Sequence, residues 1–372
     1  MVYKVPFVNY PEHYRRIWNE VNGAISEVLT KGDLILRDQL RQFEQNVASF
    51  VGVKHGVGLN SGTDALFLSL KASGIGPGDE VVTVAHTFVA SIAAIVHCEA
   101  TPVLVDVGED MNMDVEQIEQ GISSKTKAIM PVHLNGRLCD MGRLMAIADE
   151  HNLIVVEDAA QALGATFNGK KAGSFGLSGC FSFYPAKTLG AAGDAGMLTT
   201  NNDEMAEKVR LLRDHGQQRS TGEILFYGFN SRLDNLQAAI LNVKLKYVPE
   251  WNERRRELAN LYHKGLSDLR DIKLPPPPRS DSRFFDVYQN YVIRSKKRDQ
   301  LVEYLRESGV EVLVSWPKPL QHHEALGLGK FHLPKTEQIS KEVLSLPMYP
   351  ELSDEQVEFV IEVIHDFYKR MP

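Results

Sequence analysis

The sequence has little cysteine and no long uninterrupted run of apolar residues. Its three cysteines, Cys98, Cys139 and Cys180, show neither a pairing pattern nor a spacing to histidine that is typical of a metal site. We therefore expect reduced thiols and no metal. The first residues hold no apolar segment long enough for a signal peptide, and the most apolar region, residues 89–107, is interrupted by charged residues and proline. These absences argue against a disulfide-rich secreted domain and a membrane span, and they predict a cytoplasmic protein.

An excess of charge of one sign is also missing. The chain has 41 Lys and Arg against 48 Asp and Glu, which gives a net charge of −7. This balance gives no electrostatic reason to expect a nucleic acid as partner. The apolar fraction of 43% is ordinary for a globular protein, and 372 residues are more than one hydrophobic core usually serves. The composition therefore predicts a globular chain with two domains.

Residues 53–200 alternate short apolar runs with longer amphipathic stretches. The apolar runs are typical of buried strands and the amphipathic stretches of helices. We expect strands over residues 53–59, 81–84, 103–107, 128–133, 154–157 and 179–183. We expect helices over residues 63–72, 87–97, 115–121 and 141–151. Continuous apolar strands separated by helices predict an α/β domain whose mostly parallel sheet is covered by helices on both faces.

The pattern changes in the last third of the chain. Residues 233–266 are predicted to be helical with an interruption at Pro249, and the four prolines at 275–278 indicate a connector. Beyond the connector we expect strands over residues 287–293 and 310–314, and helices over residues 298–308 and 354–368. The sequence thus predicts a large domain over residues 1–245 and a smaller C-terminal α+β domain over residues 246–372.

Residues 60–66, Asn-Ser-Gly-Thr-Asp-Ala-Leu, lie between an expected strand and an expected helix. Gly62 allows a close approach of the backbone to an anion, Thr63 adds a hydroxyl, and the helix N-terminus supplies unpaired N–H groups. The alternative is an ordinary helix cap formed by Ser61 or Thr63. Taken alone, this segment favours the cap.

Asp158 lies at the carboxyl end of an expected strand, where open α/β sheets bind ligands. A carboxylate at this place can keep a pyridine nitrogen protonated, so that the ring withdraws electrons from a carbanion. Gln161, three residues later, can hydrogen-bond a ring oxygen. An acidic residue at a strand end is by itself more often a cap or a turn residue.

Lys187 follows the expected strand at 179–183 and precedes a glycine-rich segment. A desolvated lysine can attack an aldehyde and form a Schiff base, and Ser182 can donate to the same phosphate as Thr63. A single lysine is usually a solvated surface residue, so this signal is weak alone. The ordered set of a phosphate cradle, an acid, and a serine before a lysine supplies every group that a pyridoxal phosphate site requires.

The chain resembles the DegT/StrS-type (DegT/DnrJ/EryC/StrS) nucleotide-sugar aminotransferases, which have aminotransferase fold type I. The resemblance covers nearly the whole chain and is carried by VPFVNY, GVKHGVGLNSGTDALFLSL, GIGPGDEVV, TPVLVDV, KAIMPVHLNGR, VVEDAAQALGA, SFYPAKTLGAAGDAGML and GFNSRLDNLQAAIL. It implies a pyridoxal phosphate enzyme, with a pyridoxamine phosphate form in its cycle. Such an enzyme moves an amino group from an amino acid, glutamate by expectation, to a keto group of a nucleotide-linked sugar. It also implies a homodimer with a shared active site, and a role in amino-sugar biosynthesis for lipopolysaccharide or antibiotics.

The resemblance assigns roles around the ring of the cofactor. Lys187 would form the Schiff base and move a proton between the substrate and the cofactor, and Asp158 would pair with the pyridinium nitrogen. Gln161 would contact the hydroxyl side of the ring. His86 would stack on one ring face. Without the resemblance, we would interpret His86 as a core histidine with satisfied hydrogen bonds.

The resemblance also assigns the phosphate site. Gly62, Thr63 and Ser182 would bind the phosphate, and Asn230 would reach it from a neighbouring subunit. The alternative for Asn230 is the cap of a helix that starts near Leu233, and both roles can hold together.

Candidates for the sugar-binding residues rest on their position in the chain. They are Tyr184, His215, Arg219, Trp316 and His322. The family often has tyrosine at the position of Asn135, and the loop from residue 215 to 227 identifies no particular sugar. The wording NSRLDNLQAA resembles the subgroup that acts at C3 of keto-6-deoxyhexoses linked to thymidine diphosphate.

Two other functions remain open. An amino-acid aminotransferase of the same fold would clamp a carboxylate with a bidentate arginine from the small domain, and residues 287–372 show no motif for it. A non-enzymatic regulatory or binding homologue would have no need of Lys187 or Asp158, and the acidic chain shows no basic helix-turn-helix. Because histidine in place of Lys187 marks the sugar dehydratases of the family, lysine favours the aminotransferase.

Overall fold

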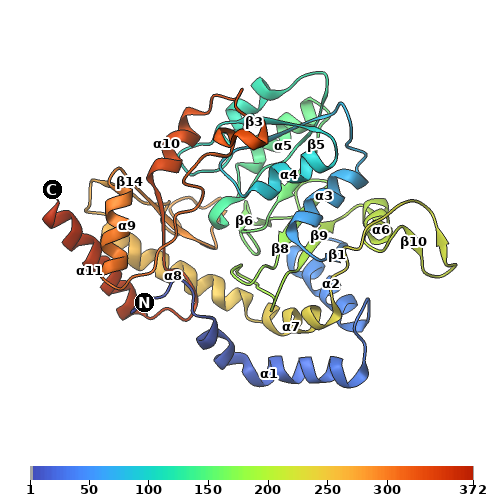
Figure 1. Ribbon diagram of the computed structural model, residues 1–372, viewed down its shortest axis with the longest axis horizontal. Coiled ribbons are helices and arrows are strands. Elements are labelled where there is room, and N and C mark those ends of the chain that lie inside the picture. The colour runs from blue at the N-terminus through green and yellow to red at the C-terminus, as the bar shows by residue number, and fades with distance from the viewer. Residues whose placement is uncertain (1–2, 372) are drawn as a thin grey trace.

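A computed structural model describes residues 3–371, and its centre is a seven-stranded sheet (Figure 1). The strands follow the order β1-β9-β8-β5-β4-β2-β3. Their bounds are His55–Leu59 (β1), Glu80–Val84 (β2), Thr101–Val105 (β3), Thr126–Ile129 (β4), Ile154–Asp158 (β5), Ser178–Ser182 (β8) and Gly196–Thr200 (β9). All pairs from β3 to β8 are parallel, whereas β9 is antiparallel to both of its neighbours. The predicted mostly parallel sheet is confirmed, and β9 is a strand that the sequence analysis missed.

All strands of this sheet except β9 end at the same edge, and four of them lead into predicted site residues. β2, β5 and β8 run in one direction because every pair in the series β2-β4-β5-β8 is parallel. β1 runs in that direction too, because β9 reverses direction relative to β8 and again relative to β1. The carboxyl ends of β1, β2, β5 and β8 therefore lie along one edge, which is where open α/β sheets bind ligands.

Helices cover both faces of the sheet (Figure 1). The neighbouring residues Val81 and Val82 of β2 belong to two different apolar clusters, as expected for a strand with both faces buried. The helices of this domain are α1 (Tyr10–Lys31), α2 (Asp38–Val51), α3 (Gly62–Ala72), α4 (Val89–His97), α5 (Met141–Glu150), α6 (Asp203–Leu212) and α7 (Asn235–Leu245), with the 3-10 helices η1 (Val115–Gly121) and η2 (Leu134–Gly136). The sequence analysis had not predicted α1 and α2, which pack on α7.

A second, smaller group of elements lies on the left in Figure 1. It contains a sheet of order β12-β14-β15, and helices α8 and α11 pack on each other. The bounds are Val248–Leu266 (α8), Ile272–Lys273 (β12), Tyr291–Ser295 (β14), Arg298–Glu307 (α9), Leu320–His322 (η3), Glu324–Leu326 (η4), Pro334–Glu342 (α10), Val343–Leu346 (β15) and Asp354–Arg370 (α11). Its apolar cluster also includes Val5, so the N-terminal segment packs on this group. The division between residues 245 and 246 stays a prediction.

Two short sheets connect distant parts of the chain. One has the order β13-β6-β7 and pairs a segment after the prolines with the large domain, and the other is the hairpin β10-β11 at the right of Figure 1. The bounds are Thr166–Phe167 (β6), Lys170–Lys171 (β7), Phe284–Phe285 (β13), Gln217–Gln218 (β10) and Glu223–Ile224 (β11).

Several predicted strands differ from the structure. Residues 310–314 form no strand, because Val310 and Leu313 make only isolated bridges to two different segments, at Val5 and at Ser345 of β15. The strand predicted from residue 287 begins only at Tyr291, since Tyr288 has a φ of 47°, which breaks extended backbone. The strand predicted over residues 128–133 ends at Ile129, ahead of Pro131, which has no N–H for the ladder.

The long predicted helix is two helices, α7 and α8, with Pro249 in the first turn of α8. Proline is tolerated there because the first turn of a helix needs no N–H donor from it. The interruption predicted near Pro249 is therefore confirmed, and the break lies at residues 246–247, directly before α8 begins.

The three cysteines are free and buried. Burial raises the pKa of the Cys98 thiol to about 11, and it raises the pKa values of Cys139 and Cys180 as well. Within residues 3–371, no helix combines the length and the apolar character that a bilayer crossing requires. The same residues contain no cluster of three side chains suited to hold a metal ion.

Gly179 and Gly23 offer a matched pair of substitutions. A Cβ at Gly179 in β8 would lie 2.1 Å from the Cα of Gly173. Gly179→Ala should therefore displace backbone and lower the free energy of unfolding by about 2 kcal/mol. Gly23 lies in α1 with nothing within 4 Å of an added Cβ, so Gly23→Ala should raise the free energy of unfolding by about 0.5–1 kcal/mol. Urea unfolding followed by circular dichroism measures both, and shifts of the same sign would contradict the close approach of Gly179 to Gly173.

Candidate active site

The predicted site residues of the large domain lie along the common carboxyl edge of the sheet. Gly62 and Thr63 follow β1, His86 follows β2, Asp158 ends β5, and Ser182 ends β8. A Cβ added to Gly62 would lie 2.7 Å from the Cβ of Ser182, so the first and third predicted clusters are in contact. The fold thus brings together residues that lie more than a hundred positions apart in the sequence.

Lys187 lies in the loop between β8 and β9, and its backbone N–H donates to Tyr184 O at 2.8 Å. Its side-chain Nζ makes no hydrogen bond and no ion pair with any residue from 3 to 371. Burial lowers the pKa of the Lys187 ammonium from its ordinary value, and the charge of Asp158 opposes that shift. A larger share of this amine is therefore neutral and nucleophilic than in a solvated lysine.

Asp158 is buried and accepts two hydrogen bonds. Ser91 Oγ donates to Asp158 Oδ2 at 2.7 Å, and the backbone N–H of Ala160 donates to Oδ1 at 3.2 Å. Thr87 Oγ1 lies 2.8 Å from Ser91 Oγ and can donate to it in turn. Burial raises the pKa of Asp158, while Ser91, Ala160 and the charge of Lys187 lower it. The carboxylate keeps acceptor capacity for one further N–H group.

The strand end that carries Asp158 rests on a buried pair, Glu157 and His133. Glu157 accepts from the backbone N–H groups of Gly173, Phe175 and Gly176 at 2.7–3.0 Å. His133 Nδ1 accepts from a backbone N–H, so that its Nε2 carries the proton and donates to Glu157 at 3.1 Å. A buried carboxylate with four donors holds the strand end in place. The sequence analysis missed this pair, although Glu157 directly precedes Asp158.

The N-terminus of α3 has both of the properties proposed for it from the sequence. Ser61 caps the helix, because its Oγ accepts from the N–H of Asp64 at 3.1 Å, so the prediction of a cap is confirmed. The backbone N–H groups of Gly62 and Thr63 have no partner within the described residues. Two unpaired donors at a helix N-terminus, next to Ser182, are groups that can donate to an anion.

His86 is 2% exposed, and its Nδ1 has no hydrogen-bond partner among the described residues. Its ring meets the ring of Trp316 edge to face, with centroids 5.5 Å apart. A core histidine with satisfied hydrogen bonds is therefore the wrong interpretation of His86. Trp316 lies within residues 246–372, the predicted small domain. Through its contact with His86, that part of the chain adds a side chain to this side of the candidate site.

Gln161 and Asn135 are joined by one hydrogen bond. The backbone N–H of Asn135 donates to Gln161 Oε1 at 2.7 Å, which leaves the Gln161 amide N–H groups free to donate elsewhere. Asn135 has a φ of 57°, a conformation that asparagine tolerates better than most side chains do. The asparagine that departs from the family pattern thus fits its backbone position.

Asn230 is exposed and forms an isolated bridge with Asp214. The helix that follows it begins at Asn235 and is preceded by Asp234 as N-cap residue, so the predicted cap role of Asn230 is wrong. Asn230 follows the hairpin β10-β11, around which apolar side chains are exposed. They are Ile224, Leu225, Tyr227 and Phe229, and Tyr227 is fully exposed.

Of the remaining substrate candidates, Tyr184 accepts the hydrogen bond from the Lys187 backbone N–H, and the others make no hydrogen bond to Lys187 within residues 3–371. Tyr184 is 55% exposed beside the Lys187 loop. His215 is exposed, Arg219 pairs with Asp214 at 2.6 Å, and His322 pairs with Glu337 at 3.3 Å.

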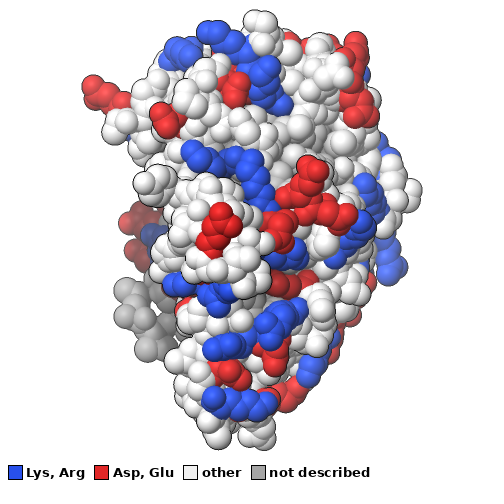
Figure 2. Space-filling view, turned by 90° about the vertical axis from the view of Figure 1, so that its right-hand side faces the viewer, with Lys and Arg blue, Asp and Glu red and all other residues white. Residues whose placement is uncertain are grey.

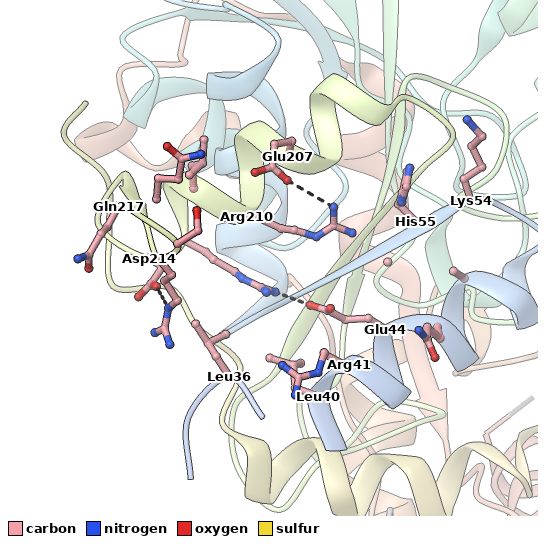
Figure 3. Close-up of a pocket in the computed structure, with 18 residues that line it drawn as sticks. Leu36, Leu40, Arg41, Glu44, Lys54, His55, Glu207, Arg210, Asp214 and Gln217 are labelled. Carbon is pink, nitrogen blue, oxygen red and sulfur yellow. Dashed lines mark hydrogen bonds and ion pairs between the residues drawn. The ribbon is translucent and has the colours of Figure 1, made fainter. Parts of the chain in front are cut away.

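Arg219 instead lines a cavity of about 610 Å³ between α2, α6 and the hairpin, which neither Lys187 nor Asp158 lines. Figure 3 shows Arg41 and Glu44 of α2 on one side of this cavity and Glu207 and Arg210 of α6 on the other. Its cations are matched by nearby carboxylates, so their charges are compensated within the cavity.

The chain matches a known family over most of its length. The model of the DegT/DnrJ/EryC1/StrS aminotransferase family covers residues 15–365. A "pleiotropic regulatory protein" of Geobacillus stearothermophilus is 42% identical, over 98% of this chain and 99% of the relative. A dTDP-3-amino-3,6-dideoxy-alpha-D-galactopyranose transaminase of Aneurinibacillus thermoaerophilus is 42% identical, over 98% and 99%.

The fold is shared with a solved structure at nearly full length. The crystal structure of DesV of S. venezuelae, in complex with a ketimine intermediate, superposes with a TM-score of 0.94. The two chains are 39% identical, and the match covers 98% of each. The fold that carries this arrangement at the carboxyl edge is therefore also the fold of a protein solved with a ketimine intermediate.

Burial of His86 should make stability depend on pH. Burial lowers the pKa of His86 from 6.5 to about 4, so the unfolded chain binds this proton at a higher pH than the folded chain does. Stability is therefore lost as the pH falls below 6.5. Between about pH 7 and pH 4.5, the free energy of unfolding of the wild type should fall by about 2 kcal/mol more than that of His86→Phe. Urea unfolding at both pH values measures the difference, and parallel pH profiles would contradict the depressed pKa.

Proposed function

The chain belongs to the DegT/DnrJ/EryC1/StrS aminotransferase family, and we propose that it aminates the C3 keto group of a nucleotide-linked sugar, with its pyridoxal phosphate held through Lys187. Enzymes of this family are pyridoxal-phosphate-dependent aminotransferases. The observation that carries the proposal is the Lys187 amine, which is desolvated and unpartnered and lies within electrostatic reach of the buried Asp158.

The phosphate of the cofactor fits the N-terminus of α3. The free N–H groups of Gly62 and Thr63 can donate to its oxygens, and so can the hydroxyls of Thr63 and Ser182. The small distance between Gly62 and Ser182 leaves no room for a side chain at position 62. We assign these residues to the phosphate.

The ring of the cofactor fits the polar groups left unpaired at the sheet edge. Asp158 would accept from the ring nitrogen, and a cation there keeps the carboxylate ionised in spite of its burial. Gln161 would donate to the ring oxygen, because its Oε1 is already occupied by Asn135. His86 would cover one face of the ring with its neutral imidazole. When bound, pyridoxal phosphate supplies an electron sink for the bonds at the amine-bearing carbon.

Lys187 has two tasks in this proposal. Its neutral amine would hold the cofactor, and the same amine would take up and return the proton of the substrate carbon. Both tasks need an amine whose pKa lies below that of a solvated lysine, which burial provides. The proposed reaction has two substrates, an amino acid and a keto sugar. The amino acid, glutamate by expectation, would give its amino group to the enzyme before the sugar accepts it.

The choice of sugar rests on a relative and on resemblance. The transaminase of Aneurinibacillus thermoaerophilus is named for a dTDP-linked 3-amino-3,6-dideoxy sugar. We propose a dTDP-linked 3-keto-6-deoxyhexose as substrate, for amino sugars of lipopolysaccharide or antibiotics, made in the cytoplasm. Tyr184, His215, Arg219, Trp316 and His322 remain the proposed sugar contacts, and the T-shaped contact of Trp316 with His86 supports Trp316 among them.

Two buried arginines of the small domain, Arg294 and Arg298, are already engaged and form no carboxylate clamp. Arg294 is buried and pairs with Glu342 and Glu109 at 2.7–2.9 Å. Arg298 is bound to Asp299 and to the carbonyl oxygens of Ser340 and Val343. Neither guanidinium is free to hold an amino acid in two hydrogen bonds, so the sugar aminotransferase is favoured over an amino-acid-only enzyme.

A regulatory role has less support, even though one relative bears a regulatory name. On the face that Figure 2 displays, acidic and basic side chains are mixed and form no field of one sign. A protein that binds DNA needs a basic surface. The intact set of Lys187, Asp158 and the phosphate cradle is explained by catalysis alone.

We propose a homodimer in which the hairpin segment reaches the partner. The exposed apolar side chains around the hairpin are typical of an interface. Asn230 lies at the end of this segment, and its side chain has no partner within residues 3–371 of its own chain. This arrangement supports the expectation that Asn230 binds the phosphate of the neighbouring subunit.

The reaction and its substrate can be tested with a panel of nucleotide-linked keto sugars. Purified enzyme with glutamate should aminate a dTDP-linked 3-keto-6-deoxyhexose, and the product is identified by mass and proton NMR. UDP-linked and 4-keto sugars complete the panel. Lys187→Ala should reduce turnover by at least about 10³-fold, since the amine both bonds the cofactor and moves the proton. Amination of 4-keto sugars alone would contradict the choice of C3, and amination of keto acids alone would contradict the sugar substrate.

A heterodimer of two impaired variants tests whether the site is shared between subunits. A heterodimer with Lys187→Ala in one subunit and Asn230→Ala in the other should recover about half of the wild-type activity, because one of its two sites has both residues intact. The Asn230→Ala homodimer should bind the cofactor about tenfold more weakly, as expected for one lost hydrogen bond to a phosphate. Two affinity tags on the coexpressed subunits allow the heterodimer to be purified. A heterodimer no more active than the Asn230→Ala homodimer would place Asn230 in its own subunit's site.

A further inference from the structure

Gln289 of the small domain holds the backbone on both sides of Lys187. Its Oε1 accepts from the N–H of Thr188 at 2.6 Å and from the Thr188 hydroxyl at 2.7 Å. Its Nε2 donates to the carbonyl oxygen of Ala186 at 2.7 Å. The orientation of the amide follows from its partners, since an N–H can only donate and a carbonyl can only accept. The residue before Lys187 and the residue after it are thus bound to the same side chain.

Gln289 is itself fixed from two directions. Arg255 of α8 donates from Nη1 to the carbonyl oxygens of Tyr288, Gln289 and Met348 at 2.8–3.2 Å. A Cβ at Gly136 would lie 2.8 Å from the N atom of Gln289, so a large-domain loop packs directly on this backbone. Gln289 is 6% exposed. It is therefore a rigid support for the Lys187 loop and not a mobile surface side chain.

The residue after Gln289 reaches the other side of the site. Asn290 Nδ2 donates to Asn135 Oδ1 at 3.3 Å, and the N–H of Asn135 donates to Gln161 at 2.7 Å. Residues 289 and 290 are thus bound to the loop of the amine and, through Asn135, to the glutamine proposed to face the ring. Residues 289 and 290, which make these contacts, lie directly before β14, which begins only at Tyr291.

We propose that Gln289 is a positioning residue that directs the Lys187 amine to the cofactor aldehyde. This inference rests on the function proposed above. In the bonding step, the neutral amine nitrogen attacks the aldehyde carbon, a C=N bond forms, and the aldehyde oxygen leaves as water. A lysine side chain has four rotatable bonds, so fixing the peptides around it restricts where its nitrogen can go. The phosphate cradle is held by α3 and β8 and does not depend on Gln289.

The test distinguishes the covalent bond between Lys187 and the cofactor from non-covalent binding of the cofactor in the site. Pyridoxal phosphate is bonded by Lys187, whereas pyridoxamine phosphate has no aldehyde and needs only the cradle and the ring contacts. We expect Gln289→Leu to slow covalent capture of pyridoxal phosphate by the apoprotein about tenfold, since three buried hydrogen bonds are lost. The dissociation constant of pyridoxamine phosphate should change by less than about twofold. Stopped-flow absorbance gives the capture rate, and fluorescence titration gives the dissociation constant.

A second variant tests the same contact more gently. Thr188→Val keeps the shape of the side chain and the backbone N–H but removes the hydroxyl that donates to Gln289. It should slow capture about threefold and leave pyridoxamine phosphate binding unchanged. This variant keeps the proposal falsifiable if Gln289→Leu fails to fold.

Gln237 provides the matched control. Its Oε1 accepts from the N–H of Ala192 at 2.9 Å, so it is a glutamine bound to the same loop but five residues beyond Lys187. Gln237→Leu should leave the capture rate within about twofold of the wild type. If Gln237→Leu lowered the capture rate as much as Gln289→Leu, the loop as a whole would decide the rate. The hydrogen bonds of Gln289 to Ala186 and Thr188 would then have no special role.

The pH dependence of capture adds a readout that a purely structural role would not move. In the wild type the capture rate should rise with pH around a pKa below that of ordinary lysine, because the amine is buried. In Gln289→Leu the midpoint should move up toward the ordinary value of about 10.4 as the amine gains solvent.

The outcomes are distinguishable from those of the proposed function. If borohydride reduction labels a lysine other than Lys187 in the wild type, the proposed function fails. If Lys187 is labelled and both variants capture pyridoxal phosphate at the wild-type rate, only the role of Gln289 is overturned. Equal losses of capture and of pyridoxamine phosphate binding would also overturn it, because Gln289 would then support the whole site.

Discussion

The common direction of four strands is the constraint on which the rest of the structure depends. β1, β2, β5 and β8 end at one edge because β9, alone among the strands of the sheet, runs the other way between β8 and β1. Without that reversal, the N-terminus of α3 would lie at the opposite edge from Asp158. Gly196 at the start of β9 also permits this arrangement, because a Cβ at this position would lie 2.2 Å from the backbone of Ser61.

Burial acts in opposite directions on the two charged residues at this edge. It lowers the pKa of Lys187 and raises that of Asp158, and each charge opposes the shift of the other. Both groups are thus poised to change their protonation when a partner arrives. Ser91 and the Glu157–His133 pair keep the carboxylate in place while it remains incompletely paired. The reactivity of the site is therefore a property of its surroundings and not of any single residue.

The sequence was sufficient for elements with strong local signals. Apolar runs such as residues 154–157 predicted strands of the sheet correctly, and the predicted cap of α3 by Ser61 is confirmed. It was not sufficient where pairing is decided by distant residues. Val310 and Leu313 look like a strand locally, but each pairs singly with a different distant segment, at Val5 and at Ser345. Gln289 carries no local signal, because its importance comes from Thr188 and Ala186, a hundred residues earlier. The roles proposed for the site residues rest on their order in the sequence and on the family resemblance.

The buried cysteines have a practical consequence. Thiol-directed dyes and spin labels react with the exposed thiolate, and all three native thiols are covered, with raised pKa values. The native cysteines should therefore react little with such probes at neutral pH. One cysteine introduced beside Tyr227, whose side chain is fully exposed, would carry the only signal. Its emission or line shape would report directly on whether the hairpin is free in water or pressed against another subunit.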